Sequence, residues 1–150
     1  MIDNNLFEKI KIDDVLASGK SVRIHLQGYS MYPLIIPEKD EVVISPLKNH
    51  NIRRGDVLLF RRKSGKQVLH RVFRVNGSKL YFVGDNQSEI EGPISLYQVY
   101  GIMTGFYKKK IYFSVHNPFY ILSWKVWLFL LPDREKISNF IHKLKTGNKS

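Results

Sequence analysis

Three side chains of the sequence have the chemical types that acyl transfer requires: Ser30, His70 and Asp85. Ser30 lies in Gly28–Pro33, where glycine and proline predict a rigid bend that exposes a hydroxyl and aims backbone N–H groups at one point. His70 lies in an alternating segment typical of a strand, and an imidazole with a pKa near ~6.5 can remove a serine proton at pH 7. Asp85 follows a further strand, and an acid there could hold the histidine in one tautomer.

Each of these residues also has an ordinary structural interpretation. Serines are common in turns, His70 could be a strand histidine that hydrogen bonds a neighbour, and Asp85 stands between a glycine and an asparagine as turn aspartates often do. Neither face of the strand around His70 is purely apolar, so the pattern leaves the direction of its side chain open. Glu89 and Glu91 are typical of a solvated acidic loop. The residues alone leave both interpretations open.

The sequence carries no pattern for metal, nucleotide or thiol chemistry. It contains no cysteine, no HExxH, no GxGxxG and no Walker loop, so we expect neither a metal ion nor a cofactor. The net charge is +11, and residues 106–150 hold 9 of the 24 Lys and Arg residues but 2 of the 13 acids, which concentrates the positive charge beside the most apolar segment. This arrangement favours an anionic membrane surface over nucleic acid, because basic pairs such as Arg53 and Arg54 lack interleaved aromatic residues. We therefore expect no nucleic-acid partner.

The elements that must position the candidate residues are mostly short strands. Alternation and turn residues predict strands at 21–27, 41–45, 56–61, 67–75, 79–83, 98–106 and 110–114. Asn76 and Gly77 predict a two-residue hairpin turn, and a short helix over 7–18 should end at Gly19. With 150 residues, one domain is expected. Residues 1–114 therefore form, by prediction, a mostly β domain: a compact coiled barrel or sandwich.

Residues 115–150 predict a helical tail, apolar at first and then basic and amphipathic. Asn117, followed by proline, is typical of a helix start. The segment Phe119–Leu131 is apolar nearly all round, yet it is too short to span the ~30 Å hydrocarbon core of a bilayer. Two alternatives stay open for this segment. It packs on the β domain or on another copy, or it lies in a membrane interface with Trp124 and Trp127 at the level of the lipid headgroups.

Several short segments, in this order, resemble the type I signal peptidase family, within the larger group that includes the self-cleaving LexA-like repressors. The segments are Gly28–Leu34 (GYSMYPL), Arg54–Phe60 (RGDVLLF), Val68–Val72 (VLHRV), Gly84–Asn86 (GDN), Gly92–Ile94 (GPI) and Val99–Gly101 (VYG). The resemblance covers roughly residues 13–105 and implies the fold of that family. It also implies that Ser30 is the nucleophile, that Asp85 is the acid of the family's Gly-Asp-Asn segment, and that His70 replaces the lysine base of most bacterial members, as in the archaeal and endoplasmic-reticulum branch.

The sequence departs from the family in three ways. Gly28 stands where family members often have a serine whose hydroxyl assists the oxyanion hole, so this donor is missing. The resemblance implies that Gly28, Met31 and the backbone N–H of Ser30 contact the oxyanion or the substrate. The family's downstream aspartate falls near Glu91, to which a second acid role can be transferred. Neither the family's N-terminal membrane anchor nor a secretory signal is visible. We therefore expect a cytoplasmic location, with peripheral membrane contact through residues 119–131 as the alternative.

The resemblance implies a serine endopeptidase that cleaves a leader or precursor peptide by a Ser-His-Asp mechanism. A LexA-like regulator that cuts only itself is a second hypothesis, although those relatives use a lysine base and no DNA-binding domain precedes residue 13. A third hypothesis is a catalytically inactive binding module that kept the fold, which Gly28 and the missing anchor would fit. The oligomeric state stays open.

Overall fold

The structure is a computed structural model that describes residues 12–147. A short helix over residues 12–17 comes first, and the part of the predicted helix at 7–11 lies outside the described residues. The strands are β1 (Val22–His25), β2 (Glu41–Pro46), β3 (Val57–Arg61), β4 (Gln67–Asn76), β5 (Lys79–Val83), β6 (Glu91–Ser95), β7 (Val99–Lys108) and β8 (Ile111–Ser114). A 3-10 turn, η1 (Leu96–Gln98), precedes β7, and the helices α2 (Pro118–Phe129) and α3 (Arg134–Gly147) end the described chain.

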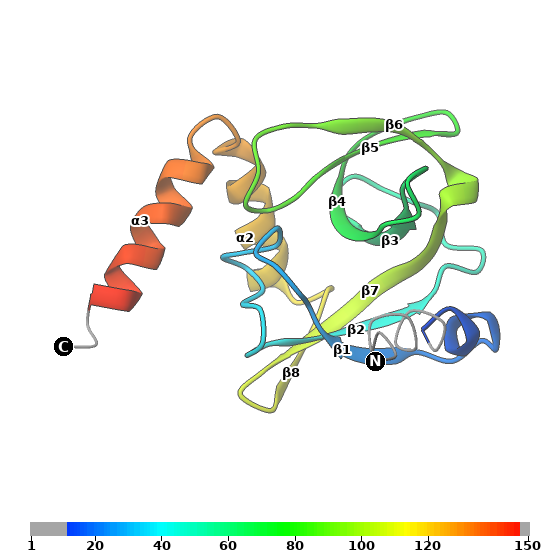
Figure 1. Cartoon of the computed structure of the whole chain (residues 1–150), viewed down its shortest axis with the longest axis horizontal. Coiled ribbons are helices and arrows are strands. Elements are labelled where there is room, and N and C mark those ends of the chain that lie inside the picture. The colour runs from blue at the N-terminus through cyan, green and yellow to red at the C-terminus, as the bar shows by residue number, and fades with distance from the viewer. Residues whose placement is uncertain (1–11, 148–150) are drawn as a thin grey trace.

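The eight strands within the described residues form one antiparallel sheet. Their order is β1-β2-β7-β3-β4-β5-β6, and β8 pairs with β7. The sheet is strongly curved, and the long strand β7 runs between its two halves (Figure 1). β1 and β6 stand at opposite ends of this order and do not pair with each other. The prediction of a mostly β fold is therefore confirmed, but the sheet is open and does not close into a barrel, and helices stand at both ends.

The sheet is buried on both faces at β3. Val57 and Leu59 contribute to one core cluster and Leu58 and Phe60 to the other, because successive side chains of a strand point to opposite faces. The first cluster also contains residues of β2, β7 and the loop after β1, namely Met31, Ile35, Val42, Ile44, Met103 and Phe106. The second contains residues of β4, β5 and β6, among them Val72, Phe82 and Ile94. β3 therefore fixes the two halves of the sheet relative to each other.

Local signals predicted most elements correctly. The hairpin between β4 and β5 turns at Asn76 and Gly77, and Gly77 has a φ of +59° that suits glycine. The Asn117 side chain accepts hydrogen bonds from the backbone N–H groups of Phe119 and Tyr120, which confirms it as the N-cap of α2. β6 was not predicted. It contains Pro93, and proline within a sheet is confined to edges such as this one.

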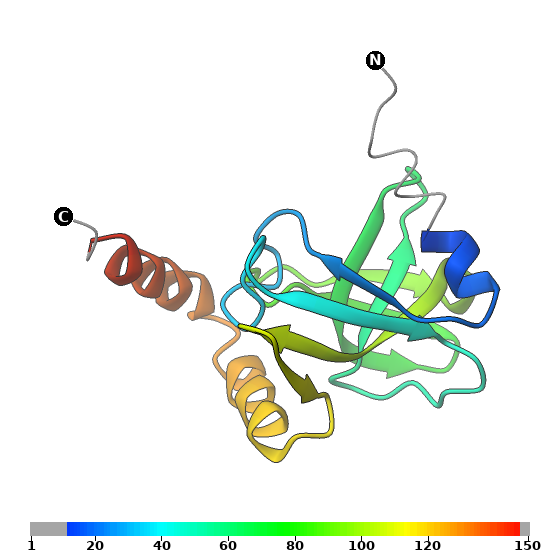
Figure 2. The ribbon, with the colours of Figure 1, turned by 90° about the horizontal axis from the view of Figure 1, so that it is seen from below.

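The two C-terminal helices differ in how they meet the sheet. α2 lies against the sheet near β8, and α3 extends away from the turn that joins the helices (Figures 1 and 2). Trp127 is buried, and the Trp124 ring packs over Gly55, where an added β-carbon would lie 2.3 Å from the ring. Of the two alternatives for this segment, packing on the β domain therefore describes both tryptophans. Neither α2 nor α3, nor the helix at 12–17, is long and apolar enough to cross a membrane.

Candidate active site

Ser30 lies in the loop between β1 and β2, and backbone contacts fix it there. The Ser30 carbonyl accepts a hydrogen bond of 2.8 Å from the backbone N–H of Asn86, in the loop after β5. A β-carbon on Gly84 would lie 2.8 Å from the same carbonyl oxygen. The two loops can therefore approach this closely only because residue 84 is a glycine.

Ser30 and His70 line the same groove, which has a volume of about 620 Å³. The walls come from β1 and the loop after it, from β3 and β4, and from the loop after β5, and include Ile24, Leu26, Tyr29, Leu59, Leu69 and Gln87. Within residues 12–147, no hydrogen bond joins the Ser30 hydroxyl to His70. The structure thus brings the predicted nucleophile and base to one groove without a hydrogen bond between them.

The His70 ring is buried, at 3% exposure, and one of its nitrogens is bound to a carboxylate. His70 Nδ1 lies 2.8 Å from Glu91 Oε1. The other side of that carboxylate is held by Arg62, whose Nε donates to Oε2 at 2.9 Å and whose Nη2 donates to Oε1 at 3.0 Å. A two-pronged contact of this kind fixes both the position and the plane of a carboxylate. Arg62 therefore orients Glu91, and Glu91 orients His70.

The electrostatics of this group make His70 neutral and Glu91 ionised at pH 7. Burial lowers the pKa of His70 below its ordinary 6.5, although the Glu91 carboxylate opposes the shift. Burial alone would raise the pKa of Glu91, but Arg62 and His70 outweigh it and the net shift is downward. An ionised carboxylate can only accept hydrogen bonds, so the His70 proton is assigned to Nδ1. Nε2 then has a free lone pair, as a general base requires.

Asp85 occupies a different environment from the one predicted. It is fully buried, and its two carboxylate oxygens each accept a hydrogen bond of 2.8 Å from Arg71, through Nε and Nη2. Arg71 Nη1 also donates to the Gly55 carbonyl at 2.9 Å and to the Tyr120 hydroxyl at 3.2 Å. The hydrogen bond expected between Asp85 and His70 is therefore not formed, and Glu91, to which the resemblance transferred only a second acid role, takes that place.

The two residues expected to contact the oxyanion or the substrate, Gly28 and Met31, lie in different environments. Gly28 is exposed and lines the groove with a φ of +77°, and an added β-carbon would meet no atom within 4 Å. The positive φ, rather than a steric clash, therefore favours glycine at position 28. Glycine offers no side-chain donor to an oxyanion. Met31 is 1% exposed and lies in the first core cluster, outside the groove. Its side chain belongs to the core and does not line the groove.

The C-terminal helices hold the loop after β5 from the other side. Trp127 Nε1 donates to the Asp85 carbonyl at 2.5 Å. Arg134 donates through Nη2 to the Gly84 carbonyl at 2.7 Å and through Nε to the Gln87 carbonyl. The backbone of residues 84–87 is therefore fixed by α2 and α3 on one side while Asn86 binds the Ser30 carbonyl on the other. No local signal in the sequence indicates this connection, because it joins segments more than forty residues apart.

α3 also contacts the Ser30 loop. The His142 ring lies with its centroid 6.2 Å from that of Tyr29 and 6.0 Å from that of Tyr32, in edge-on arrangements. These tyrosines flank the turn that carries Ser30. Both loops of the candidate site are thus in contact with the helical tail.

Comparison of the chain with protein-family models and with curated proteins found no match.

Proposed function

We propose that the protein is a serine endopeptidase in which Ser30 is the nucleophile, His70 the base and Glu91 the acid that orients His70. The observation that carries the proposal is the fixed, neutral His70, held through Nδ1 by Glu91 on the groove that Ser30 also lines. The resemblance of the short segments around Ser30 and His70 to type I signal peptidases supports the same reaction. The proposal differs from the initial hypothesis in the acid, because Asp85 is occupied by Arg71.

The reaction would proceed as ordinary acyl transfer. His70 Nε2 takes the Ser30 hydroxyl proton while Oγ attacks the carbonyl carbon of a substrate peptide bond. The developing oxyanion would be met by backbone N–H groups of the Ser30 turn, since Gly28 offers no side-chain donor. His70 returns the proton to the leaving amine, and a water molecule, activated by the same nitrogen, hydrolyses the acyl-enzyme. The Glu91 carboxylate stabilises the imidazolium that exists between these proton transfers.

The substrate would be an extended peptide that adds to the edge of the sheet. β1 pairs with β2 alone among the described strands, so its other edge has free backbone groups next to the groove. Ile24 of β1 and Leu26 just after it line that groove. Addition of a strand to such an edge supplies backbone hydrogen bonds, and the lining side chains supply selectivity. Small residues before the cleaved bond are what the family resemblance implies.

The proposal is tested by cleavage of a diverse peptide pool, with products identified by mass spectrometry. We expect cuts with the wild type and none with Ser30→Ala or His70→Ala. Ser78→Ala, in the exposed β4–β5 hairpin, is the matched control and should cleave as the wild type does. The same cuts from Ser30→Ala would refute the assignment. If the folded wild type cuts no peptide and does not cut itself, the inactive binding module becomes the better account.

A further inference from the structure

One face of α2 is exposed and apolar along its whole length. Phe119, Leu122, Val126 and Phe129 recur every three or four residues, so they form one stripe on a helix of 3.6 residues per turn. The two phenylalanines at its ends are 84% and 85% exposed. Large aromatic side chains this accessible on one stripe mark an interaction surface rather than scattered exposure. We call these four residues the α2 stripe.

The opposite face of α2 is fixed to the body of the protein. Tyr120, Trp127 and Leu128 are buried, and Trp127 donates its hydrogen bond to the Asp85 carbonyl. The α2 stripe therefore cannot turn inward without breaking this contact. It is therefore an exposed apolar surface of the described chain.

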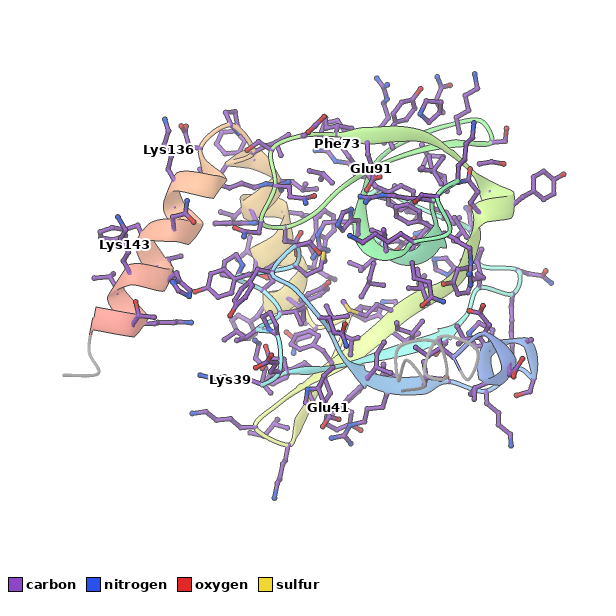
Figure 3. All side chains as sticks on the ribbon, viewed as in Figure 1. Lys39, Glu41, Phe73, Glu91, Lys136 and Lys143 are labelled. Atoms are coloured by element: carbon purple, nitrogen blue, oxygen red, sulfur yellow. The ribbon has the colours of Figure 1, made fainter. Side chains whose placement is uncertain are left out.

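One lysine borders the α2 stripe, and further lysines are exposed on α3. Lys125 is exposed and borders the α2 stripe, three residues after Leu122 and four before Phe129. On α3, Lys136 and Lys143 are exposed, and Figure 3 shows both on the side away from the sheet. Phe140 and Leu144, one helical turn apart, are exposed near them. Aromatic and aliphatic residues flanked by lysines are the composition of helices that lie in the interface of an anionic bilayer.

We infer that the α2 stripe docks on an anionic lipid bilayer, with Phe119 and Phe129 inserted among the headgroups and the lysines against lipid phosphates. A second copy of the chain is the weaker occupant. Each copy carries a net charge of +11 and would bring the same lysines into apposition. The four side chains also present only roughly 500 Å² of apolar surface, below the ~800 Å² per partner of a stable interface. This inference is independent of the proposed peptidase activity.

The test is flotation of the full chain with vesicles of two compositions: phosphatidylcholine alone, and two parts phosphatidylcholine to one part phosphatidylglycerol. We expect the wild type to float with the anionic vesicles and to release them as salt is raised. Phe119→Ser with Phe129→Ser should weaken this binding by at least about tenfold, since each phenylalanine loses its apolar contact. Lys125→Gln, Lys136→Gln and Lys143→Gln together should abolish the preference for phosphatidylglycerol.

The matched control is Leu96→Ser with Tyr97→Ser, which removes two exposed large side chains, 45% and 102% exposed, from η1. η1 lies at the other end of the molecule from α3, and this variant should bind vesicles as the wild type does (Figure 1). Circular dichroism establishes that each variant is folded. The inference fails if the wild type does not float with anionic vesicles, or if the serine variant of α2 floats equally well. It also fails if light scattering finds a dimer that this variant abolishes while no vesicle binding is seen, because a second copy would then cover the α2 stripe.

Discussion

His70 and Glu91 are joined by a 2.8 Å hydrogen bond, although β5 separates their strands, β4 and β6, in the sheet. Strands two places apart lie about 9–10 Å from each other, a span that an imidazole and a glutamate side chain can bridge together. Figure 3 shows Glu91 in the half of the molecule that carries β4 and β6. The two acids of the region thereby have separate tasks: Glu91 binds the candidate base, and Asp85 binds Arg71.

The activity should depend on pH through His70. Burial lowers the pKa of His70, so the ring stays neutral to more acidic pH than a free histidine does. Only the neutral ring can accept the Ser30 proton. We therefore expect kcat/KM to rise with pH through a midpoint below 6.5 and to be level above pH 7. A rate that begins to rise only above pH 8 would indicate a base other than His70.

Replacement of Asp85 should lower the stability of the fold. Asp85→Ala leaves the buried Arg71 guanidinium without its carboxylate, and the loss of one member of a buried pair costs about 3–5 kcal/mol of unfolding free energy. Urea unfolding measures the change. Asp14→Ala, at an exposed position of the N-terminal helix, is the control and should change the unfolding free energy by less than about 0.5 kcal/mol. Equal stability of the two variants would contradict the role assigned to Arg71 and Asp85.

Gly84 should be intolerant of any side chain. In Gly84→Ala the new β-carbon would lie 2.8 Å from the Ser30 carbonyl oxygen and 2.7 Å from Gln87 Oε1, so the Ser30 turn must move. Since misplacement of a nucleophile by about 1 Å can cost roughly 100-fold in rate, we expect kcat to fall by about 10- to 100-fold. Peptide cleavage under saturating substrate gives kcat, and urea unfolding shows whether the fold is retained. Unchanged kcat in a folded variant would mean that this contact does not position Ser30.

Trp127 is expected to act as a positioning residue. Trp127→Phe keeps an aromatic ring but removes the N–H that binds the Asp85 carbonyl, at a cost of about 1 kcal/mol in stability. If this bond positions the loop next to Ser30, kcat should fall by roughly three- to tenfold while KM stays constant. Trp124→Phe is the matched control, because the Trp124 ring packs over Gly55 and, within residues 12–147, makes no hydrogen bond to this loop. An equal effect of both substitutions on kcat would contradict the positioning role of Trp127.

Local signals in the sequence predicted every described strand except β6, the β4–β5 hairpin and the N-cap of α2, because each depends on residues next to one another. The position of Glu91 depends on β6, and the Gly-Pro pair in that strand resembles a loop. Its partnership with His70 also requires the pairing of β4 with β5 and of β5 with β6. No short-range pattern encodes these pairings. The segment Phe119–Leu131 is apolar nearly all round, so its sequence pattern does not show which face packs on the sheet. The inward position of Trp127 therefore could not be predicted.

The most direct test of the account compares wild type and Glu91→Gln in the rate and pH dependence of peptide cleavage. Glutamine keeps the size of the side chain but removes the charge that stabilises protonated His70. We expect kcat/KM to fall by about 10²- to 10⁴-fold, and the residual activity to have its midpoint at lower pH, because Glu91 raises the pKa of His70. Urea unfolding should show a stability close to that of the wild type, since the Arg62–Glu91 pair is partly exposed. Cleavage by folded Glu91→Gln at the wild-type rate and with the wild-type pH midpoint would contradict the account.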